Sequence, residues 1–363
     1  MISRLLLIFS LLSIIFAYNE RYGVELYQES QDARNAALGG WCASYIEGNN
    51  SSLLKFATNS AVHFSHKNKY AGLIDVTLFS YIRQGDKYPY YVSLTSRIID
   101  GIDDTRYPIW NDYDGDDVPG SDEINYSEIN QFSQQEIGFQ LGTIRQMGSY
   151  TIGINLKPNL TSLAEFWSYG ISGDVSMLVE PSHRFWISLR AEDLINFKYW
   201  DSGRLETRVP LIIGSANFDF RNLKVGVETG LRLEENYLLN YHLGIEFIQQ
   251  KYLFFRIGTS HDNQFTLGLG FQPSLIDFSY AYLHPDLDSP FKASHIISMG
   301  LFIQDQLVAC VGQYTYNPDS GQCELITVTS GDLNGDGLIN VLDVVVLVNI
   351  ILGYGDPVDA GDL

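Results

Sequence analysis

Apolar and polar residues alternate with a period of two through most of the chain, from about residue 60 to residue 305. The clearest run places apolar or β-branched side chains on one face and charged side chains or glycine on the other. The first face carries Leu223, Val225, Val227, Thr229, Leu231 and Leu233, and the second carries Lys224, Gly226, Glu228, Gly230, Arg232 and Glu234. Successive side chains of a strand point to opposite faces, so the pattern predicts β-strands with one apolar face.

About fourteen segments show this alternation, near residues 61–67, 71–82, 89–101, 133–143, 149–157, 171–180, 184–193, 208–219, 222–234, 237–249, 252–260, 263–272, 275–284 and 294–303. Many are longer than the roughly 5–6 residues of a typical globular strand. A tilted strand needs about 9–11 residues to cross a bilayer, and a closed barrel leaves no unpaired sheet edge in lipid. We therefore predict an all-β fold, a closed antiparallel transmembrane β-barrel of about fourteen strands.

A soluble β-sandwich or lipocalin-like barrel is the alternative, because it also alternates but turns its apolar face inward. The sequence does not show the direction of the faces. Strand length, strand number and aromatic residues near strand ends favour the membrane barrel. In that barrel Val225 and Val227 face lipid, and Lys224 and Glu228 face the lumen.

Two segments interrupt the strand pattern, and a third follows it. Residues 102–131 form a polar, acidic insertion, and residues 158–170 are predicted as a short helix or plug element. Residues 306–330 carry no strand pattern and are predicted as a linker.

The N-terminus has the features of an export signal. Arg4 supplies positive charge, residues 5–16 are almost entirely apolar, and Ala17 is a plausible cleavage point. The apolar run is shorter than the roughly 20 residues of a transmembrane helix, which leaves a retained anchor as the alternative. We predict a signal peptide over residues 1–17 and a mature protein in the outer membrane, surrounded by its lipid.

Charge and composition exclude some function classes. The net charge of −20 argues against nucleic acid as a partner, because binding phosphates requires clustered Lys and Arg. No Ser-His-Asp or paired-carboxylate arrangement stands out, so we expect no enzyme and no catalytic residues. Of the three cysteines, Cys310 and Cys323 would close a short disulfide loop in an exported chain, with free thiols as the alternative, and Cys42 is the third.

The C-terminal tail contains an EF-hand-like calcium loop over residues 332–343. Calcium prefers six to eight oxygen ligands, which such a loop supplies from positions 1, 3, 5, 7, 9 and 12. Those positions hold Asp332, Asn334, Asp336, Leu338 (through its carbonyl), Asn340 and Asp343. Gly337 at position 6 permits the sharp turn, and an apolar segment that ends at Gly353 predicts a short helix after the loop. The tail is therefore predicted to bind Ca²⁺.

Asp343 at position 12, where the usual EF-hand has Glu, resembles a type I dockerin repeat. The triplet Gly331-Asp332-Leu333 recurs as Gly361-Asp362-Leu363, so we expect a second copy that is truncated. A dockerin implies a cohesin-like protein partner, although the recognition positions 10 and 11 hold apolar Val341 and Leu342. A fainter calcium candidate lies in the acidic insertion, where a solvated loop is the favoured interpretation. It consists of Asp112, Asp114, Asp116 and Glu123, with Asp117 in place of the glycine.

The barrel region resembles the PorV/PorQ-type outer-membrane proteins, relatives of the FadL fatty-acid transporter barrels. The segments that carry the resemblance are 33–40 (ARNAALGG), 64–66 (FSH), 153–157 (GINLK), 169–174 (YGISGD), 210–214 (PLIIG) and 294–300 (SHIISMG). The chain departs from the family at residues 57–61, where Asn59 stands without the proline of an Asn-Pro-Ala-Gly turn. The resemblance implies a barrel that serves in protein secretion or in the passage of hydrophobic compounds, with a secretion-system protein or a hydrophobic ligand as partner.

These features give four predicted regions: a signal peptide (1–17), an outer-membrane barrel (18–305), a linker (306–330) and a dockerin-like calcium-binding repeat (331–363). Two functions follow. The barrel transports or secretes, with the tail docking a partner, or the barrel is a membrane anchor that presents a calcium-dependent interaction module.

Overall fold

The computed structural model describes residues 25–27, 29–47, 49–85, 88–104, 113, 115, 120, 123–124, 129–232, 238–250, 252–261, 264–285, 290–303, 314–317, 322–325 and 345. The chain divides into two compact units, Met1–Ile303 and Gln304–Leu363. Among the described residues, no helix is long and apolar enough to cross a membrane.

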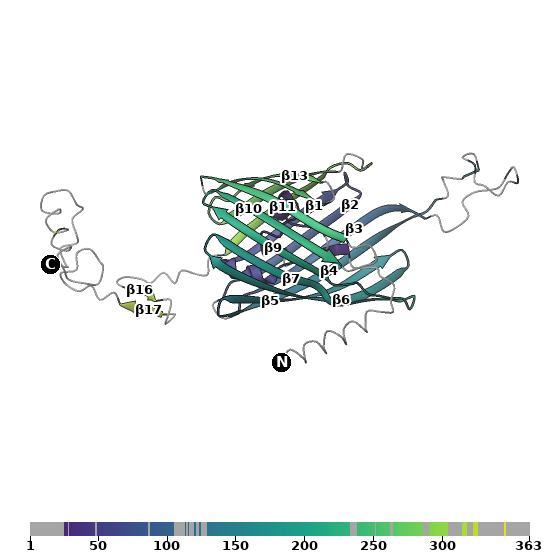
Figure 1. The fold of residues 1–363 in the computed structure, drawn as a ribbon. Coiled ribbons are helices and arrows are strands. Elements are labelled where there is room, and N and C mark those ends of the chain that lie inside the picture. The colour runs from purple at the N-terminus through teal and green to yellow at the C-terminus, as the bar shows by residue number, and fades with distance from the viewer. Residues whose placement is uncertain are drawn as a thin grey trace. The chain divides into compact units, whose positions relative to one another are not determined.

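The first unit is a β-barrel around short helical elements (Figure 1). The helical elements are η1 (Glu25–Tyr27), α2 (Ala33–Ala37) and η2 (Ser51–Phe56). The strands are β1 (Ser60–Lys69), β2 (Ile74–Arg83), β3 (Tyr90–Asp103), β4 (Gln131–Met147), β5 (Tyr150–Leu163), β6 (Phe166–Ser182), β7 (Phe185–Trp200), β8 (Leu205–Glu206), β9 (Leu211–Phe220), β10 (Leu223–Arg232), β11 (Leu238–Gln249), β12 (Leu253–Ser260), β13 (Phe265–Phe271), β14 (Ile276–His284) and β15 (Ser294–Ile303).

The strands close into a ring. Of the 15 strands in the sheet, the two-residue β8 pairs only with β7, and the other fourteen each pair with two antiparallel neighbours. The first and last strands of the ring complete it, with β1 and β15 in register from Ser60↔Ile303 to Asn68↔His295. No strand of the ring leaves an unpaired edge for lipid to meet. The predicted closed antiparallel barrel of about fourteen strands is confirmed.

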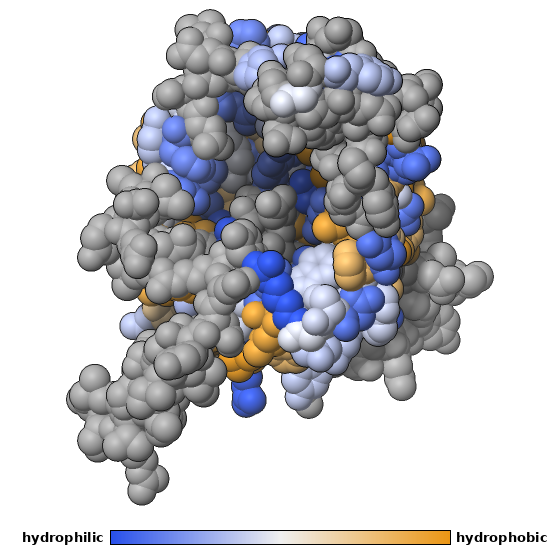
Figure 2. All heavy atoms as spheres, turned by 90° about the vertical axis from the view of Figure 1, so that its right-hand side faces the viewer, coloured by the Kyte–Doolittle hydropathy of each residue, from blue (hydrophilic) through white to orange (hydrophobic). Residues whose placement is uncertain are grey.

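The apolar faces of the strands point outward, as expected for a membrane barrel. On β10, Val227 is 39% exposed, whereas Glu228 beside it is 2% exposed and faces the lumen. Figure 2 views the barrel toward one end, with hydrophilic residues in the hollow and hydrophobic residues along the flanks. A soluble barrel would show the reverse arrangement.

The two ends of the barrel differ in their connections. At one end the strands join through two-residue turns at 148–149, 183–184 and 221–222, while the other end carries the longer connections 104–130, 201–210 and 285–293. Outer-membrane barrels have short periplasmic turns and longer extracellular loops. We call the two ends the inner rim and the outer rim accordingly.

Aromatic residues line both rims, as predicted. At the inner rim Phe185 stacks on Phe218 with ring centroids 4.6 Å apart. At the outer rim Trp167, Tyr169 and Tyr199 form a chain of ring contacts at 6.1 and 5.7 Å. These girdles lie at the depths where aromatic side chains meet the lipid–water interface.

The prediction of a helix or plug element at residues 158–170 is wrong. This segment contains the end of β5, a tight turn at Ala164 and the start of β6, with Leu163 paired to Phe166. Its apolar residues have a spacing compatible with a helix, but the polar residues between them decide the structure. Thr161 and Ser168 are buried in the lumen, whereas Leu160 and Trp167 are exposed on the outside. The period is therefore two, as in the neighbouring strands.

The second unit contains a two-stranded hairpin, β16 (Tyr314–Asn317) and β17 (Gln322–Leu325). It falls within residues 306–330, where the sequence pattern predicts no strand. Short four-residue strands give too few alternating positions for the pattern to be visible.

The outward position of Val227 gives a test of the membrane assignment. We expect Val227→Arg to lower the free energy of unfolding into lipid vesicles by about 2–4 kcal/mol, because the charge would lie near the middle of the apolar band. Phe220→Arg, at the inner rim, should cost only about 0–1 kcal/mol. Denaturant titration followed by tryptophan fluorescence measures both. Equal costs at the two depths would contradict the membrane topology.

Candidate functional site

Residues 25–57 form a plug inside the barrel and are the centre of the candidate site. This plug comprises η1, α2, η2 and the loops between them (Figure 1). Its side chains are deeply buried, among them Ala33, Leu38 and Leu53. The helix α2 contacts β12 to β15, and η2 contacts β4 to β6 on another part of the wall. The plug therefore spans the lumen from wall to wall.

Local sequence explains the fold of α2. Asp32 is its N-cap, and its side chain accepts hydrogen bonds from the backbone N–H groups of Arg34 and Asn35. The helix ends in two glycines with positive φ, Gly39 at 72° and Gly40 at 85°. The Gly40 N–H donates to the Asn35 carbonyl at 3.0 Å and the Gly39 N–H to the Ala36 carbonyl at 3.1 Å, which is a Schellman motif.

Inward-facing glycines of the wall let the plug approach the sheet closely. A Cβ at Gly226 would overlap the Trp41 ring, and one at Gly258 would overlap the backbone of Gly39. The glycines that alternate with apolar residues in the sequence thus form a docking surface for the plug. Any larger side chain at these positions would push the plug away from the wall.

A buried row of charges ties α2 to the wall. Arg34 donates two hydrogen bonds to Glu246 of β11, at 3.0 and 2.8 Å, and Arg256 of β12 donates a third at 2.8 Å. Glu246 is almost completely buried. A bidentate Arg–carboxylate pair fixes both distance and orientation, so this contact sets where α2 lies.

A second buried cluster stabilises the loop of the plug. Glu47 accepts hydrogen bonds from the backbone N–H groups of Gln31 at 2.8 Å and Asp32 at 2.6 Å, and Asp32 contacts His63 of β1 at 2.9 Å. Burial, together with the negative charge of Asp32, raises the pKa of Glu47 to about 8. The raised pKa favours the protonated form of Glu47, which lessens the repulsion between two adjacent buried carboxyl groups.

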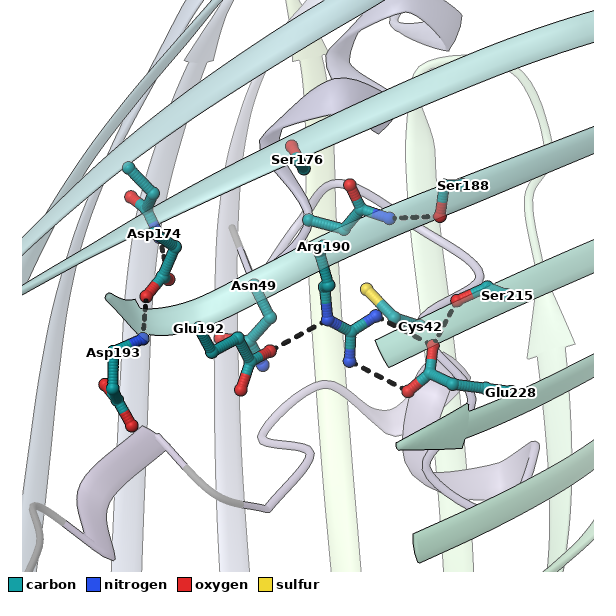
Figure 3. Close-up of polar contacts among 12 residues, drawn as sticks. Cys42, Asn49, Asp174, Ser176, Ser188, Arg190, Glu192, Asp193, Ser215 and Glu228 are labelled. Carbon is teal, nitrogen blue, oxygen red and sulfur yellow. Dashed lines mark hydrogen bonds and ion pairs between the residues drawn. The ribbon is translucent and has the colours of Figure 1, made fainter. Parts of the chain in front are cut away.

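Arg190 of β7 organises the polar network shown in Figure 3. It donates two hydrogen bonds of 2.8 Å to Glu228 of β10 and one of 2.8 Å to Glu192. The Ser215 hydroxyl also donates to Glu228 at 2.8 Å. Cys42 of the plug lies against this group as a free, buried thiol, and burial raises the pKa of that thiol.

A β-bulge next to this network brings further charges into the lumen. The register of β6 and β7 shifts after Gly173, and Asp193 takes a positive φ of 57°. Lys157 of β5 lies 2.8 Å from Asp174 and 3.7 Å from Asp193. The bulge thereby places the carboxylates of Asp174 and Asp193 beside the buried ammonium group of Lys157.

A cavity of about 570 Å³ lies between the plug and the wall near the outer rim. Its lining includes Leu211, Ile213 and Leu283 as an apolar part, and Lys67, Lys69 and Arg208 as a cationic part. The remaining lining is mostly polar and includes two further cationic side chains, Lys157 and Arg190, and five acidic ones, Glu29, Glu47, Glu192, Asp193 and Glu228. A second cavity of about 260 Å³ shares Lys67 and Lys69 with the first. The site can thus accommodate a molecule with both an apolar and an anionic portion.

Glu29 of the plug lies where the two cavities meet. Its carboxylate accepts a hydrogen bond of 2.7 Å from Lys67 and a further one from Lys69. The Lys67 side chain is 3% exposed, whereas the Glu29 side chain is 51% exposed. The ammonium groups of Lys67 and Lys69 therefore form a binding site for a carboxylate group. The carboxylate bound there, that of Glu29, is half exposed.

The calcium ligands predicted from the sequence, Asp332, Asn334, Asp336, Leu338, Asn340 and Asp343, lie outside the described residues, as do Cys310 and Asp112, Asp114 and Asp116 of the fainter candidate. Glu123 is described, and its carboxylate accepts hydrogen bonds from the N–H groups of Tyr113 at 2.6 Å and Gly120 at 2.9 Å. Within the described part of the chain, no three His, Cys, Asp or Glu side chains are grouped to hold a metal ion.

The charged residues of the lumen were not predicted as a site. Arg190, Lys157 and Arg256 each occupy an inward position of a strand, the same signal that marks Lys224 and Glu228. Lys157 and Arg256 pair with the neighbouring strands β6 and β11, and Arg190 pairs with Glu228 of β10 as well as with Glu192 of its own strand. A sequence pattern gives the face of a residue but not its neighbour across the lumen.

No family model and no curated protein matches this chain. Solved structures do match. The P. putida toluene transporter TodX has a TM-score of 0.56 and 10% sequence identity, covering 77% of this chain and 100% of TodX. The Ralstonia pickettii toluene transporter TbuX has a TM-score of 0.52 and 8% identity, covering 77% and 100% of the two chains. Identities this low concern the fold alone: this chain shares the barrel fold of TodX and TbuX.

Proposed function

We propose that the protein is an outer-membrane transport barrel for a small hydrophobic molecule that carries an anionic group. The observation that carries this proposal is the outer cavity, where an apolar wall of Leu211, Ile213 and Leu283 shares one space with Lys67 and Lys69. The export signal and the lipid-facing barrel support an outer-membrane location. The structural neighbours TodX and TbuX are toluene transporters, which supports a hydrophobic cargo.

Glu29 supports an anionic group on that cargo. A carboxylate that enters the cavity can replace Glu29 on the two lysines, so both ammonium groups stay paired throughout the exchange. This avoids the several kcal/mol that an unpaired buried charge costs. The displaced Glu29 is already half exposed and becomes hydrated. Cargo binding thus loosens the attachment of the plug at the outer rim.

Passage then requires movement of the plug, because it fills the lumen. After Glu29 is released, the plug remains attached through Arg34 to Glu246 and through Lys55 to Glu180, which lie 2.7 Å apart. The second of these pairs is partly exposed and weak in water. Cargo binding and plug displacement are therefore coupled through ion pairs.

A second candidate function rests on the tail. Six correctly placed loop positions within residues 332–343 favour a calcium-dependent docking module, with the barrel as its membrane anchor. The resemblance to PorV/PorQ-type proteins supports a role in secretion, with the docked partner an exported or cohesin-like protein.

The first prediction concerns the carboxylate site. A dansyl-labelled alkyl carboxylate should bind the purified barrel, whereas its uncharged methyl ester should bind weakly. Glu29→Gln should tighten binding of the acid about tenfold by removing a competing charge-assisted hydrogen bond, and the double variant Lys67→Ala/Lys69→Ala should abolish it. Asp219→Asn removes an ion pair with Lys224 within the wall and away from the cavity, and serves as the matched control, with unchanged affinity. Equal binding of acid and ester would refute the proposal.

The second prediction concerns natural cargo. Protein purified from its own membrane should retain amphipathic acids, detected by mass spectrometry after organic extraction. If the barrel serves secretion instead, crosslinking in cells should trap exported proteins on it. If neither amphipathic acids nor exported proteins are found, only the function as a membrane anchor remains.

The third prediction concerns the tail. Titration calorimetry of the tail with Ca²⁺ should show binding that Asp332→Ala/Asp336→Ala abolishes, because those carboxylates are direct ligands. Asp356→Ala, outside the loop, should leave binding unchanged. Absence of heat up to millimolar Ca²⁺, in a tail extended by a second repeat, would exclude the calcium site.

A further inference from the structure

Two arginines face outward at the inner rim, on the lipid-facing side of the barrel. Arg83 is the last residue of β2, and Arg145 lies two residues before the end of β4. Both side chains are exposed, in step with the outward Phe79 of β2 and Leu141 of β4. Among the strand residues whose side chains the structure describes at this rim, these two carry the outward-facing charges. The other outward positions there are apolar or uncharged.

A tyrosine stands between the two arginines. Arg83 pairs with Tyr90 of β3. Tyr90 pairs with Thr143 of β4, and Arg145 follows two residues later. The Cα atoms of the two arginines are thus separated by two strand spacings, roughly 9–10 Å, and by roughly 7 Å along β4. Long arginine side chains at this separation can hold one extended anion between them. We call Arg83, Tyr90 and Arg145 the arginine pair site.

Apolar residues surround the arginine pair site on the membrane side. The neighbouring outward residues on the flanking strands are Val62 of β1 and Ile152 of β5. Toward the middle of the barrel, Phe79, Leu94 and Phe139 form a row in register across β2, β3 and β4. All three are exposed, as lipid-facing residues are. The site thus combines two cations with an apolar surface directly beside them.

The two guanidinium groups have no counter-charge from the protein. Within the described part of the chain, neither Arg83 nor Arg145 has an ion pair or a side-chain hydrogen bond. The chain as a whole carries a net charge of −20, so acidic partners are not scarce. The other exposed arginines of this rim, Arg184 and Arg221, lie in turns beyond the strand ends, on the water side. A guanidinium on the lipid side is costly in hydrocarbon, whereas at headgroup level it can meet phosphate.

We propose that the arginine pair site binds diphosphatidylglycerol, an anionic phospholipid that carries two phosphate groups on one glycerol. The inner rim meets the periplasmic leaflet of the outer membrane, which consists of phospholipids. Each guanidinium takes one phosphate through its planar fork of N–H donors. The Tyr90 hydroxyl lies between the two and can contact the glycerol that joins the phosphates. The acyl chains then lie over Phe79, Leu94 and Phe139.

Other phospholipids match the site less well. Phosphatidylglycerol has a single phosphate, so one molecule neutralises one arginine and leaves the second without a partner. Phosphatidylethanolamine also has a single phosphate, and its ammonium group is repelled by the second arginine. Two phosphates on one molecule satisfy both arginines while only one lipid is immobilised. The site therefore predicts an order of affinity among the three lipids.

Native mass spectrometry of the full-length protein tests this proposal, with the three lipids offered in equal amounts in mixed micelles. An arginine near an anionic headgroup strengthens binding by a factor of about five. We therefore expect diphosphatidylglycerol to be retained about fivefold over phosphatidylglycerol and about 25-fold over phosphatidylethanolamine. Arg83→Gln and Arg145→Gln should each remove the preference over phosphatidylglycerol, and the double variant should retain the three lipids equally.

A matched control separates this site from the general charge of the rim. Arg221→Gln removes an exposed arginine of the same rim, in the turn between β9 and β10, and should leave both preferences unchanged. Heat-modifiable gel mobility checks that each variant is folded. Equal retention of the three lipids by the unaltered protein, which binding of an acidic protein at this surface would also leave, would overturn the proposal. So would a preference that survives the double variant, or the same loss in Arg221→Gln.

Discussion

The constraint on which this structure depends is that lipid offers no hydrogen bonds to a polypeptide backbone. A sheet that faces lipid must satisfy every N–H and C=O group itself, which only a closed ring of strands can do. The pairing of β1 with β15 is therefore the contact that makes the other pairings possible in a membrane. Closure also fixes the two faces, because one face of each strand must turn toward lipid and the other toward the lumen. Val227 and Glu228 are neighbours in sequence, yet one lies in hydrocarbon and the other in an ion pair.

A ring of fourteen strands encloses more space than its own inward side chains fill, and the plug occupies that space. Polar inward faces supply the means of holding it. Glu246 receives Arg34 from the plug and Arg256 from the wall, and Glu228 receives Arg190. Pairs of this kind add little net stability when buried, but removing one partner costs about 3–5 kcal/mol. They therefore act mainly to specify one position of the plug, and glycines of the wall provide the close contact that this position needs.

The two rims of the barrel differ in their connections and in the contacts that they make. The inner rim has short turns and the stacked pair Phe185 and Phe218, which suits a boundary with the membrane. The outer rim has longer connections and the cavity lined by Lys67 and Lys69. The candidate binding cavity thus lies at the end of the barrel that meets molecules from outside. In the cavity the plug itself contributes Glu29, so binding and opening share the same charges.

The sequence by itself determined the fourteen strands, their alternation and their length, because period two and strand length are local properties that each segment carries alone. The predicted calcium loop is local in the same way, since the ligands proposed for it fall within twelve residues. Only the tertiary structure decided which face meets lipid, since closure of β1 on β15 joins residues more than two hundred positions apart. It also showed that residues 158–170 are a hairpin and that residues 25–57 are the plug. The pairs Arg34–Glu246 and Arg190–Glu228 lie beyond any pattern in the sequence, because these side chains are far apart along the chain and meet only in the folded lumen.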